Sequence, residues 1–539
     1  MTSRFLAKKL AAVGVVAGIL GLAGCDLEVT NPGPVLSETI AATGAHLGLV
    51  NGVRLGVQGG FGQYALLGGA ITHDLMASGH TGSAGVRNEE EVALLNDLYD
   101  GRGSWGSLHR ARWIAEEAIR SWPDNPDIDA STYDRLAEVY LLAGLANRYL
   151  GENACSAVFD GGAPEPKLAY FDRAIEQFSS AAQIAQANME IDEIQTAAIG
   201  ARAAARLFKG DWAGALSDAQ QVPMAFDYQT EFSGDGGEYF NTYGHVMSTG
   251  FQSLSYWGTP AGEHFLLTGD SRVAFGYDNG SREADGGEAK RAQTHPPRTT
   301  WTSLVPMYYP LKGIAPRKGA RDFYIFQPSR SAQRTLQVSL VDGREMELVA
   351  AEAQLRMGNW QAALTHINNI RTSVEIYPID MTDKQQFDLK LHSEEQTSWN
   401  NNPKLAEYFN QDSYTLQDFS AGGMMPPVEA MSAEEVWTAL KFERLIELTL
   451  EGRRFGDRWR WRANSEPPAP SSGPGGEDTP GEYNDLEFIP TALAQSFNVP
   501  EEPLMLCFPL PKAENDTNHN IPEGYADWVE SPGYQPRPM

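Results

Sequence analysis

Two segments of this chain repeat each other without a gap. Residues 205–216 read Ala-Arg-Leu-Phe-Lys-Gly-Asp-Trp-Ala-Gly-Ala-Leu, and residues 353–364 read Ala-Gln-Leu-Arg-Met-Gly-Asn-Trp-Gln-Ala-Ala-Leu. In each segment we expect a helix, a turn at the glycine and a second helix. Glycine frees such a turn, and a small alanine lets two helices approach closely. The repeat therefore predicts that pairs of helices build much of the fold.

This arrangement of helix, turn and helix resembles a tetratricopeptide repeat, and weaker relatives of it occur elsewhere in the chain. Apolar residues recur there at helical spacing, as in an amphipathic helix. We expect about four tetratricopeptide-like helical pairs, near residues 136–187, 195–222, 343–371 and 434–462. The predicted fold is mainly α.

Long segments without helical periodicity interrupt these pairs. The stretch between the second and third pairs is rich in Gly, Tyr, Trp and Pro, and residues 464–485 are rich in Pro, Gly and Ser. A regular solenoid stacks its repeats directly. Here we expect the helices to form a scaffold for a long irregular, loop-rich half. Because long loops in a compact protein usually carry function, this half is the expected ligand-binding half.

The beginning of the chain has the composition of a secretory signal. Residues 1–24 hold three basic residues followed by the uncharged apolar run 10–24, which is too short to span a bilayer as a stable helix. The run ends in Leu22-Ala23-Gly24-Cys25, which resembles the lipobox of bacterial lipoproteins. We expect cleavage before Cys25 and lipidation of its thiol, so that lipid anchors the mature chain to a membrane. The alternative is an ordinary signal peptide that happens to precede a cysteine.

The composition excludes one class of partner and two classes of scaffold. Asp and Glu outnumber Lys and Arg by 70 to 42, and the formal net charge is −28. Such a surface repels phosphate backbones, so we expect no nucleic acid partner. The three cysteines are too few for a disulfide-built scaffold or a zinc module held by four thiolates. Cys155 and Cys507 either form a disulfide or remain two buried thiols.

Several local motifs follow one another in a characteristic order. They are Cys25-Asp26-Leu27-Glu28-Val29-Thr30-Asn31-Pro32, Asp270-Ser271-Arg272, Arg344-Glu345-Met346-Glu347-Leu348-Val349-Ala350-Ala351-Glu352-Ala353, Glu443-Arg444-Leu445-Ile446-Glu447-Leu448-Thr449-Leu450-Glu451-Gly452-Arg453-Arg454 and Phe508-Pro509-Leu510-Pro511. Across most of the chain this order resembles the SusD/RagB family of nutrient-binding lipoproteins, although Ser271 stands where the family has proline. The resemblance implies a single SusD-like domain over residues 25–539, in which four repeat pairs support an irregular ligand-binding half.

The resemblance also implies a location and an activity. Such proteins are lipid-anchored in the outer membrane, are exposed at the cell surface, and cap a SusC-like TonB-dependent transporter. We therefore expect noncatalytic binding of a nutrient, first of all an oligosaccharide, and its delivery to that transporter. Alternatives are a peptide or other nutrient bound by the same scaffold, a surface glycoside hydrolase, and a repeat-based assembly lipoprotein without a small ligand.

Three glutamates lie on one face of a predicted helix. Glu443, Glu447 and Glu451 are spaced at i, i+4 and i+8, where like charges repel. Paired carboxylates drive glycoside hydrolysis, so an acid/base pair or a metal site is one interpretation. The other is a lattice of ion pairs with nearby arginines, whose planar guanidinium suits buried carboxylates. We favour the lattice, with structural ion pairs among Glu443, Arg444, Glu447, Glu451, Arg453 and Arg454, and with Arg458 and Arg460 beside them.

The sequence holds no familiar motif for catalysis, metal binding or a cofactor. The ten histidines include no His-x-x-x-His and no His-x-His. The acidic turns at Asp278-Asn279-Gly280 and residues 285–288 do not match an EF-hand loop. A Gly-x-Ser-x-Gly motif, a P-loop and a dinucleotide fingerprint are also missing. We therefore expect no enzyme, no resident metal and no cofactor.

Aromatic residues in the irregular half are the stronger functional signal. Sugars stack their apolar C–H faces on Trp and Tyr, and their hydroxyls need polar side chains. The candidate ligand-binding residues are Asp74, His80, Arg87, Tyr256, Trp257, Trp301, Tyr308 and Tyr309. For any single aromatic among them, core packing is an equally good interpretation. Trp212 and Trp360 occupy repeat positions and are expected to pack.

Overall fold

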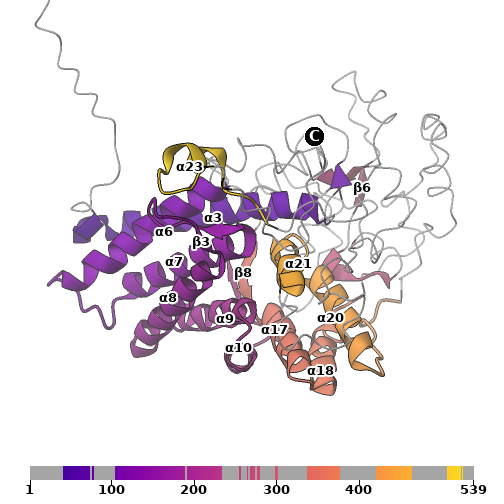
Figure 1. Cartoon of the computed structure of the whole chain (residues 1–539). Coiled ribbons are helices and arrows are strands. Elements are labelled where there is room, and N and C mark those ends of the chain that lie inside the picture. Colours follow the sequence, from indigo (N-terminus) through magenta and orange to yellow (C-terminus); the bar gives the residue numbers. More distant parts are fainter. Residues whose placement is uncertain are drawn as a thin grey trace, which may run out of the picture.

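The computed structural model describes residues 40–72, 74, 76–77, 104–188, 191–232, 254–255, 261, 264, 268–273, 276–278, 298–300, 337–376, 421–463, 507–523 and 525. Over these residues the chain is mostly helical, with a few short two-stranded ladders. The prediction of a mainly α fold is confirmed (Figure 1). The expected signal peptide 1–24 and Cys25 lie outside the described residues.

The N-terminal helices form the larger body of the frame. They are α3 (His46–Ile71), α6 (Ser104–Ser121), α7 (Asp134–Asn153), α8 (Leu168–Ala187), α9 (Asp192–Lys209) and α10 (Trp212–Ala219). Helix α7 lies at their centre, in contact with α3, α6, α8 and α9, and most of its side chains are buried. Helices α7 and α8 approach each other closely at Gly144 of α7, where an added Cβ would lie 2.4 Å from the ring of Phe178 in α8.

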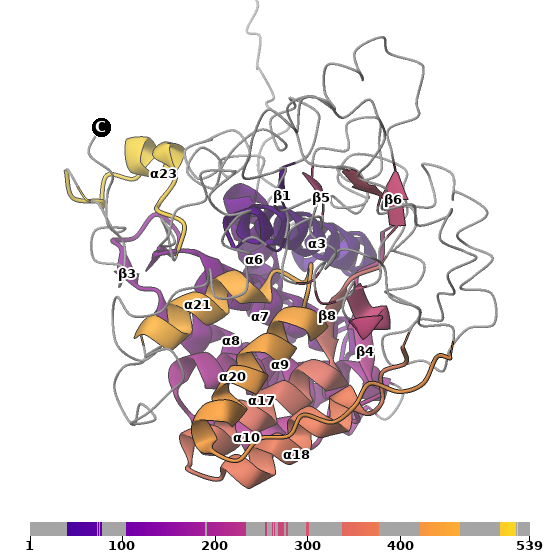
Figure 2. The same ribbon diagram turned by 90° about the vertical axis from the view of Figure 1, so that its right-hand side faces the viewer.

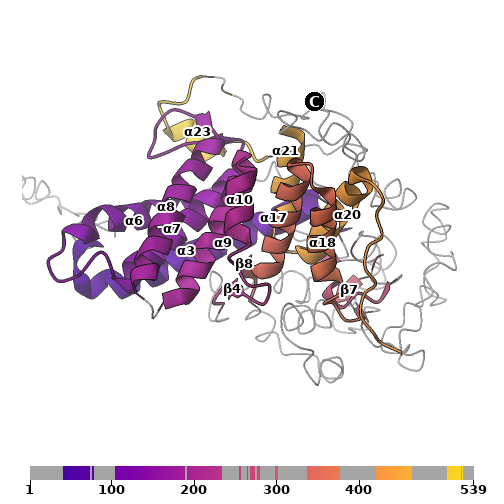
Figure 3. The same ribbon diagram turned by 90° about the horizontal axis from the view of Figure 1, so that it is seen from below.

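The later helices pack beside this body, as Figure 3 shows from below. They are α17 (Gly343–Arg356), α18 (Trp360–Arg371), α20 (Ala433–Glu447) and α21 (Arg453–Ala463). The short α23 (Lys512–Thr517) lies apart from them, over the N-terminal helices (Figure 1). Helix α17 contacts α9 and α10 on one side and α18 and α20 on the other. It therefore joins the two groups of helices.

The two matching segments form matching turns. Gly210 and Gly358 follow α9 and α17 with φ of 75° and 83°, the left-handed region that glycine adopts without strain. The Asp211 side chain then caps α10 by accepting a hydrogen bond of 3.0 Å from the Gly214 amide. Trp212 and Trp360, each the first residue of the second helix of its pair, both pack on hydrophobic clusters.

A two-stranded ladder joins the segment after α10 to the segment before α17. Strand β4 (Asp227–Gln229) pairs antiparallel with β8 (Ser339–Asp342), so Asp227 lies opposite Asp342. Asp342 then begins α17, because its carboxylate accepts hydrogen bonds of 2.8 Å from the amides of Arg344 and Glu345. The chain thus leaves the frame and returns to it at one place.

Four other short strands lie on one side of the helical frame. Strand β1 (Met76–Ala77) pairs antiparallel with β5 (Leu254–Ser255), and β6 (Gly276–Asp278) pairs antiparallel with β7 (Arg298–Thr300). Strands β5 and β7 also contact each other. In Figure 2, β1, β5 and β6 are seen together near α3.

The C-terminal segment is fixed to the end of α7. A disulfide joins Cys155 to Cys507, with the two Cα atoms 4.9 Å apart. Beside it the Phe508 amide donates to the Asn153 carbonyl at 2.7 Å, and the Cys155 amide donates to the Phe508 carbonyl at 2.8 Å. A further ladder, β2 (Ser156–Ala157) with β3 (Glu165–Pro166), follows α7.

Among the described helices, none is both long enough and apolar enough to cross a membrane.

Candidate functional site

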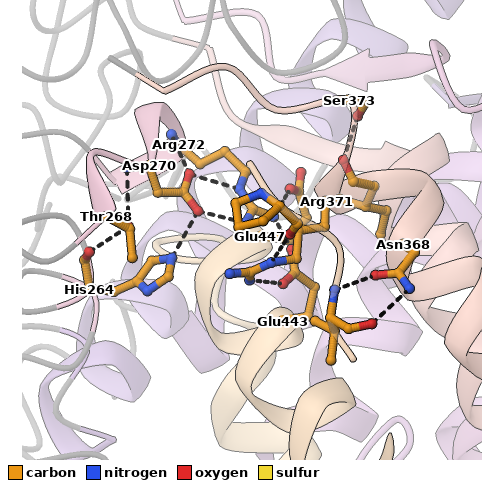
Figure 4. Close-up of polar contacts among 12 residues, drawn as sticks. His264, Thr268, Asp270, Arg272, Asn368, Arg371, Ser373, Glu443 and Glu447 are labelled. Atoms are coloured by element: carbon orange, nitrogen blue, oxygen red, sulfur yellow. Dashed lines mark hydrogen bonds and ion pairs between the residues drawn. The ribbon is translucent and has the colours of Figure 1, made fainter. Parts of the chain in front are cut away.

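A buried group of charges joins the irregular half to helix α20. Its centre is Arg272, which lies in the short 3-10 turn η4 (Ser271–Val273). The Arg272 guanidinium donates to the two oxygens of Asp270, from Nε at 3.0 Å and from Nη2 at 2.7 Å. Its Nη1 donates to Glu447 at 2.8 Å and also to Glu443 (Figure 4).

Each of these two glutamates has a second cation. Arg371 at the end of α18 lies 3.2 Å from Glu443, and Arg344 at the start of α17 lies 3.7 Å from Glu447. The repulsion expected between carboxylates at i and i+4 is therefore offset by arginines from three different segments.

The arginines that adjoin these glutamates in sequence have other carboxylate partners. Arg444 pairs with Asp457 at 2.7 Å, and Arg453 lies 3.3 Å from Glu345 and 3.7 Å from Glu152. Burial lowers the pKa of Arg453, but nearby carboxylates, Glu345 first and Glu451 among them, raise it well above its ordinary value. Arg454 lies 3.6 Å from Asp74. The lattice of ion pairs is therefore wider than proximity in sequence suggests.

Asp270 is the carboxylate of this group that directly precedes the turn η4. Burial by itself raises the pKa of Asp270, but the charge of Arg272 and the hydrogen bonds from His264 and Arg272 hold it well below its usual range. His264 donates to the Asp270 carboxylate at 3.0 Å and is itself buried. Asp270 is thus a fixed negative charge between two donors.

The geometry argues against acid/base catalysis by the glutamates of α20. The side chains of Glu443 and Glu447 are 1% and 0% exposed, and both bind the same guanidinium. A glycosidase needs two carboxyl groups that flank an accessible glycosidic bond. This pair instead holds the fold together. In the part of the chain that the structure describes, no group of three or more His, Cys, Asp or Glu residues is placed to hold a metal ion.

The structure describes one of the candidate ligand-binding residues. Asp74 follows α3, is 6% exposed and lies beside Arg454 of α21. The other candidates, which lie outside the described residues, are His80, Arg87, Tyr256, Trp257, Trp301, Tyr308 and Tyr309. Short strands next to several of them in sequence do come together, because β1 pairs with β5 and β5 contacts β7.

Comparison with known proteins relates the later part of the chain to a family. Residues 345–528, which include most of α17, the helices α18, α20 and α21 and the C-terminal segment, match the model of the SusD family. The match covers about a third of the chain and shows what this segment is similar to. No curated protein sequence matches the chain significantly.

Solved structures extend the likeness in fold to nearly the whole chain. A SusD superfamily protein from Bacteroides vulgatus ATCC 8482 has a TM-score of 0.51 at 13% identity, covering 88% of this chain and 97% of the other. A laminarin-binding SusD-like protein has a TM-score of 0.50 at 15% identity, covering 89% and 98%. A SusD/RagB family protein from Bacteroides thetaiotaomicron VPI-5482 has a TM-score of 0.50 at 11% identity, covering 92% and 98%. At these identities the likeness shows the fold.

Sequence reasoning missed the centre of the charged group. Asp270 and Arg272 were recognised only as part of a motif, and the pairing of Arg272 with α20 was not anticipated. The available signal was the Asp-x-Arg pattern itself, in which an acid and a base two residues apart share one turn. Arg344 likewise stood only within a motif, and neither His264 nor Arg371 carried any signal of its role.

Proposed function

We propose that this protein binds an oligosaccharide noncatalytically on its loop-bearing half. The observation that carries the proposal is the convergence of β1, β5 and β7. Asp74 precedes β1, Tyr256 and Trp257 directly follow β5, and Trp301 directly follows β7 in the sequence. Strands from segments distant in sequence thus come together, and each of them adjoins candidate stacking or polar residues in the sequence, which supports the proposal.

The chemistry of such a face suits a sugar. Tryptophan and tyrosine offer flat apolar surfaces to the C–H faces of a pyranose, while a carboxylate or guanidinium beside them accepts or donates hydrogen bonds to hydroxyls. A relative of the same fold is named as laminarin-binding, which supports a glycan as the ligand. The buried, arginine-bound state of Glu443 and Glu447 supports binding without hydrolysis.

We further propose that the protein acts at the cell surface. Lipidation of Cys25 would anchor it to the outer membrane, and the bound glycan would pass to a SusC-like TonB-dependent transporter. The lipobox-like Leu22-Ala23-Gly24-Cys25 and the match of residues 345–528 to the model of the SusD family support this proposal.

The binding step is tested with a glycan array followed by calorimetry, and laminarin is the first probe. Trp257→Ala and Trp301→Ala should each weaken binding, by about 1–3 kcal/mol for a lost stacking contact. Trp360→Ala is the matched control, because Trp360 packs within the helical frame. Unchanged affinity in both loop variants would exclude the proposed face. Binding to a peptide library in place of every glycan would reassign the ligand class.

Anchoring and transport are tested separately. Labelling cells with radioactive palmitate should mark the wild-type protein and leave the Cys25→Ala variant unlabelled. Purification of the wild-type protein from mild detergent should recover a large TonB-dependent barrel. Label on the Cys25→Ala variant would refute the lipid anchor, and recovery of barrel-assembly machinery instead would point to an assembly role.

A further inference from the structure

Three chain segments far apart in sequence meet in what we call the loop junction: residues 268–273, 374–376 and 423–425. The Ser271 amide donates to the Glu375 carbonyl at 3.3 Å. The Ile376 amide donates to the Gly423 carbonyl at 2.8 Å, and the Met425 amide donates to the Val374 carbonyl at 2.8 Å. The two ends of the stretch 377–422 are therefore held together, and the turn around Arg272 is held against them.

We propose that Arg272 is a positioning residue that fixes the loop junction, and with it the proposed ligand-binding face, on the helical frame. Within the turn, Arg272 binds both oxygens of Asp270. Across the junction, Arg272 also donates to Glu443 and Glu447 of α20 (Figure 4). A single guanidinium therefore joins the turn to the helical frame. The planar fork of arginine permits this multiple contact, which a lysine ammonium cannot reproduce.

Glu443 also helps to hold the third segment of the junction, residues 423–425, through Arg371. Arg371 donates from Nη1 to Glu443 at 3.2 Å and from Nε to the Pro426 carbonyl at 2.8 Å. Glu443 thus receives one arginine from the turn and one that grips the chain after residue 425. Asp270, Arg272 and Glu443 are all buried, so water cannot replace these bonds without opening the junction.

The junction leads directly to the proposed ligand face. Strand β6 begins three residues after Val273 and pairs with β7, with Tyr277 opposite Thr299. Strand β7 contacts β5, and β5 pairs with β1. A shift of the turn therefore moves the first strand of a connected series that ends beside Asp74. Only this last step, from loop position to ligand affinity, depends on the proposed function.

The test compares Arg272→Met with Arg112→Met. Arg112 in α6 is a matched control, because it too is buried and binds two carboxylates, Glu116 at 2.6 Å and Asp160 at 2.8 Å, but lies outside the junction. Hydrogen exchange is followed at residues 271–278, 298–300, 374–376 and 423–425 of the full chain. We expect exchange there to rise about tenfold or more in Arg272→Met and to stay at the wild-type level in Arg112→Met.

Ligand affinity provides the second readout, measured by calorimetry with laminarin or with the array glycan that binds the wild type best. If only about a tenth of the Arg272→Met molecules keep the wild-type arrangement of the loop junction, the apparent Kd of this variant rises about tenfold. Arg272→Lys, which keeps the charge without the fork, should fall between the wild type and Arg272→Met. A general loss of stability would affect the Arg112 variant equally.

Each outcome decides the proposal. Equal exchange at the junction in the Arg272 and Arg112 variants overturns it, as does wild-type glycan affinity in a folded Arg272→Met. If Arg272→Met does not fold, Arg272→Lys against Arg112→Lys provides the same comparison. A wild type that binds no glycan refutes the proposed function, while the exchange experiment still decides whether Arg272 fixes the junction.

Discussion

Arg148 of α7 pairs with Glu345 of α17, although 197 residues separate them in the sequence. Arg148 also binds Glu152 at 2.6 Å, and Arg453 of α21 lies within 3.3 Å of Glu345. Three helices from three different repeat pairs thus meet around one buried set of charges. Moving one of these helices away from the others would leave a buried charge without its partner, so this set favours the observed arrangement.

Arg148→Met should therefore be strongly destabilising. Removing one partner of a buried ion pair typically costs about 3–5 kcal/mol. Arg120→Met is the control, because Arg120 is 66% exposed and its pair with Glu117 should contribute about 1 kcal/mol or less. Urea unfolding measures both variants. A similarly small decrease in the free energy of unfolding in both variants would show that the buried charges around Arg148 contribute little to stability.

Gly452→Ala should destabilise the turn between α20 and α21. Gly452 has a φ of 68°, and an added Cβ would lie 2.8 Å from the backbone and the side chain of Ala65. We expect a loss of about 2 kcal/mol or more in the free energy of unfolding.

Gly358→Ala separates the two causes in this prediction. Gly358 has a φ of 83° but an added Cβ meets nothing within 4 Å, so the variant should lose only about 1 kcal/mol. Thermal unfolding compares the two variants. An equal loss in both would mean that the close approach to Ala65 has no cost of its own.

Loss of the Cys155–Cys507 disulfide should lower stability by about 2–5 kcal/mol. The bond fixes the C-terminal segment, with Phe508, against the end of α7 and limits the freedom of the unfolded chain. The double variant Cys155→Ser, Cys507→Ser should melt lower than the wild type, and a reductant should lower only the wild-type midpoint. A wild-type midpoint that the reductant leaves unchanged would contradict this role.

Lys167 should make stability depend on pH. Its Nζ lies 3.9 Å from the centre of the Trp459 ring and 3.5 Å from the Glu152 carbonyl oxygen. Burial lowers the pKa of Lys167 from 10.5 to about 7, against the opposing charge of Glu152. Between these values the unfolded state binds more protons than the folded state. Stability should therefore rise with pH in that window, by up to about 1.4 kcal/mol per unit.

Unfolding in urea at pH 7 and pH 9 measures this rise. In Lys167→Met, the contribution of Lys167 to this increase in the free energy of unfolding should disappear. Lys209→Met should show the same increase as the wild type, because Lys209 pairs with Asp172 near the surface. An identical pH slope in the wild type and in Lys167→Met would contradict the prediction.

Local patterns predicted much of the frame. The turns at Gly210 and Gly358 and the helices on either side of them follow from a repeat that is visible in the sequence, because helix periodicity and glycine turns depend on neighbouring residues. The partners of Arg444 did not follow in this way. Adjacent residues on a helix point about 100° apart, so Arg444 cannot share the face of Glu443, and it reaches Asp457 instead.

The sequence by itself determined the mainly helical frame, the repeat turns and the motifs that resemble the SusD/RagB family. The tertiary structure alone decided that Arg272 meets glutamates 171 and 175 positions later, and that Cys155 meets Cys507 after 352 positions. The physical reason is that helix formation is governed by contacts within a few residues. Ion pairs and disulfides instead depend on which distant segments the packed core brings together.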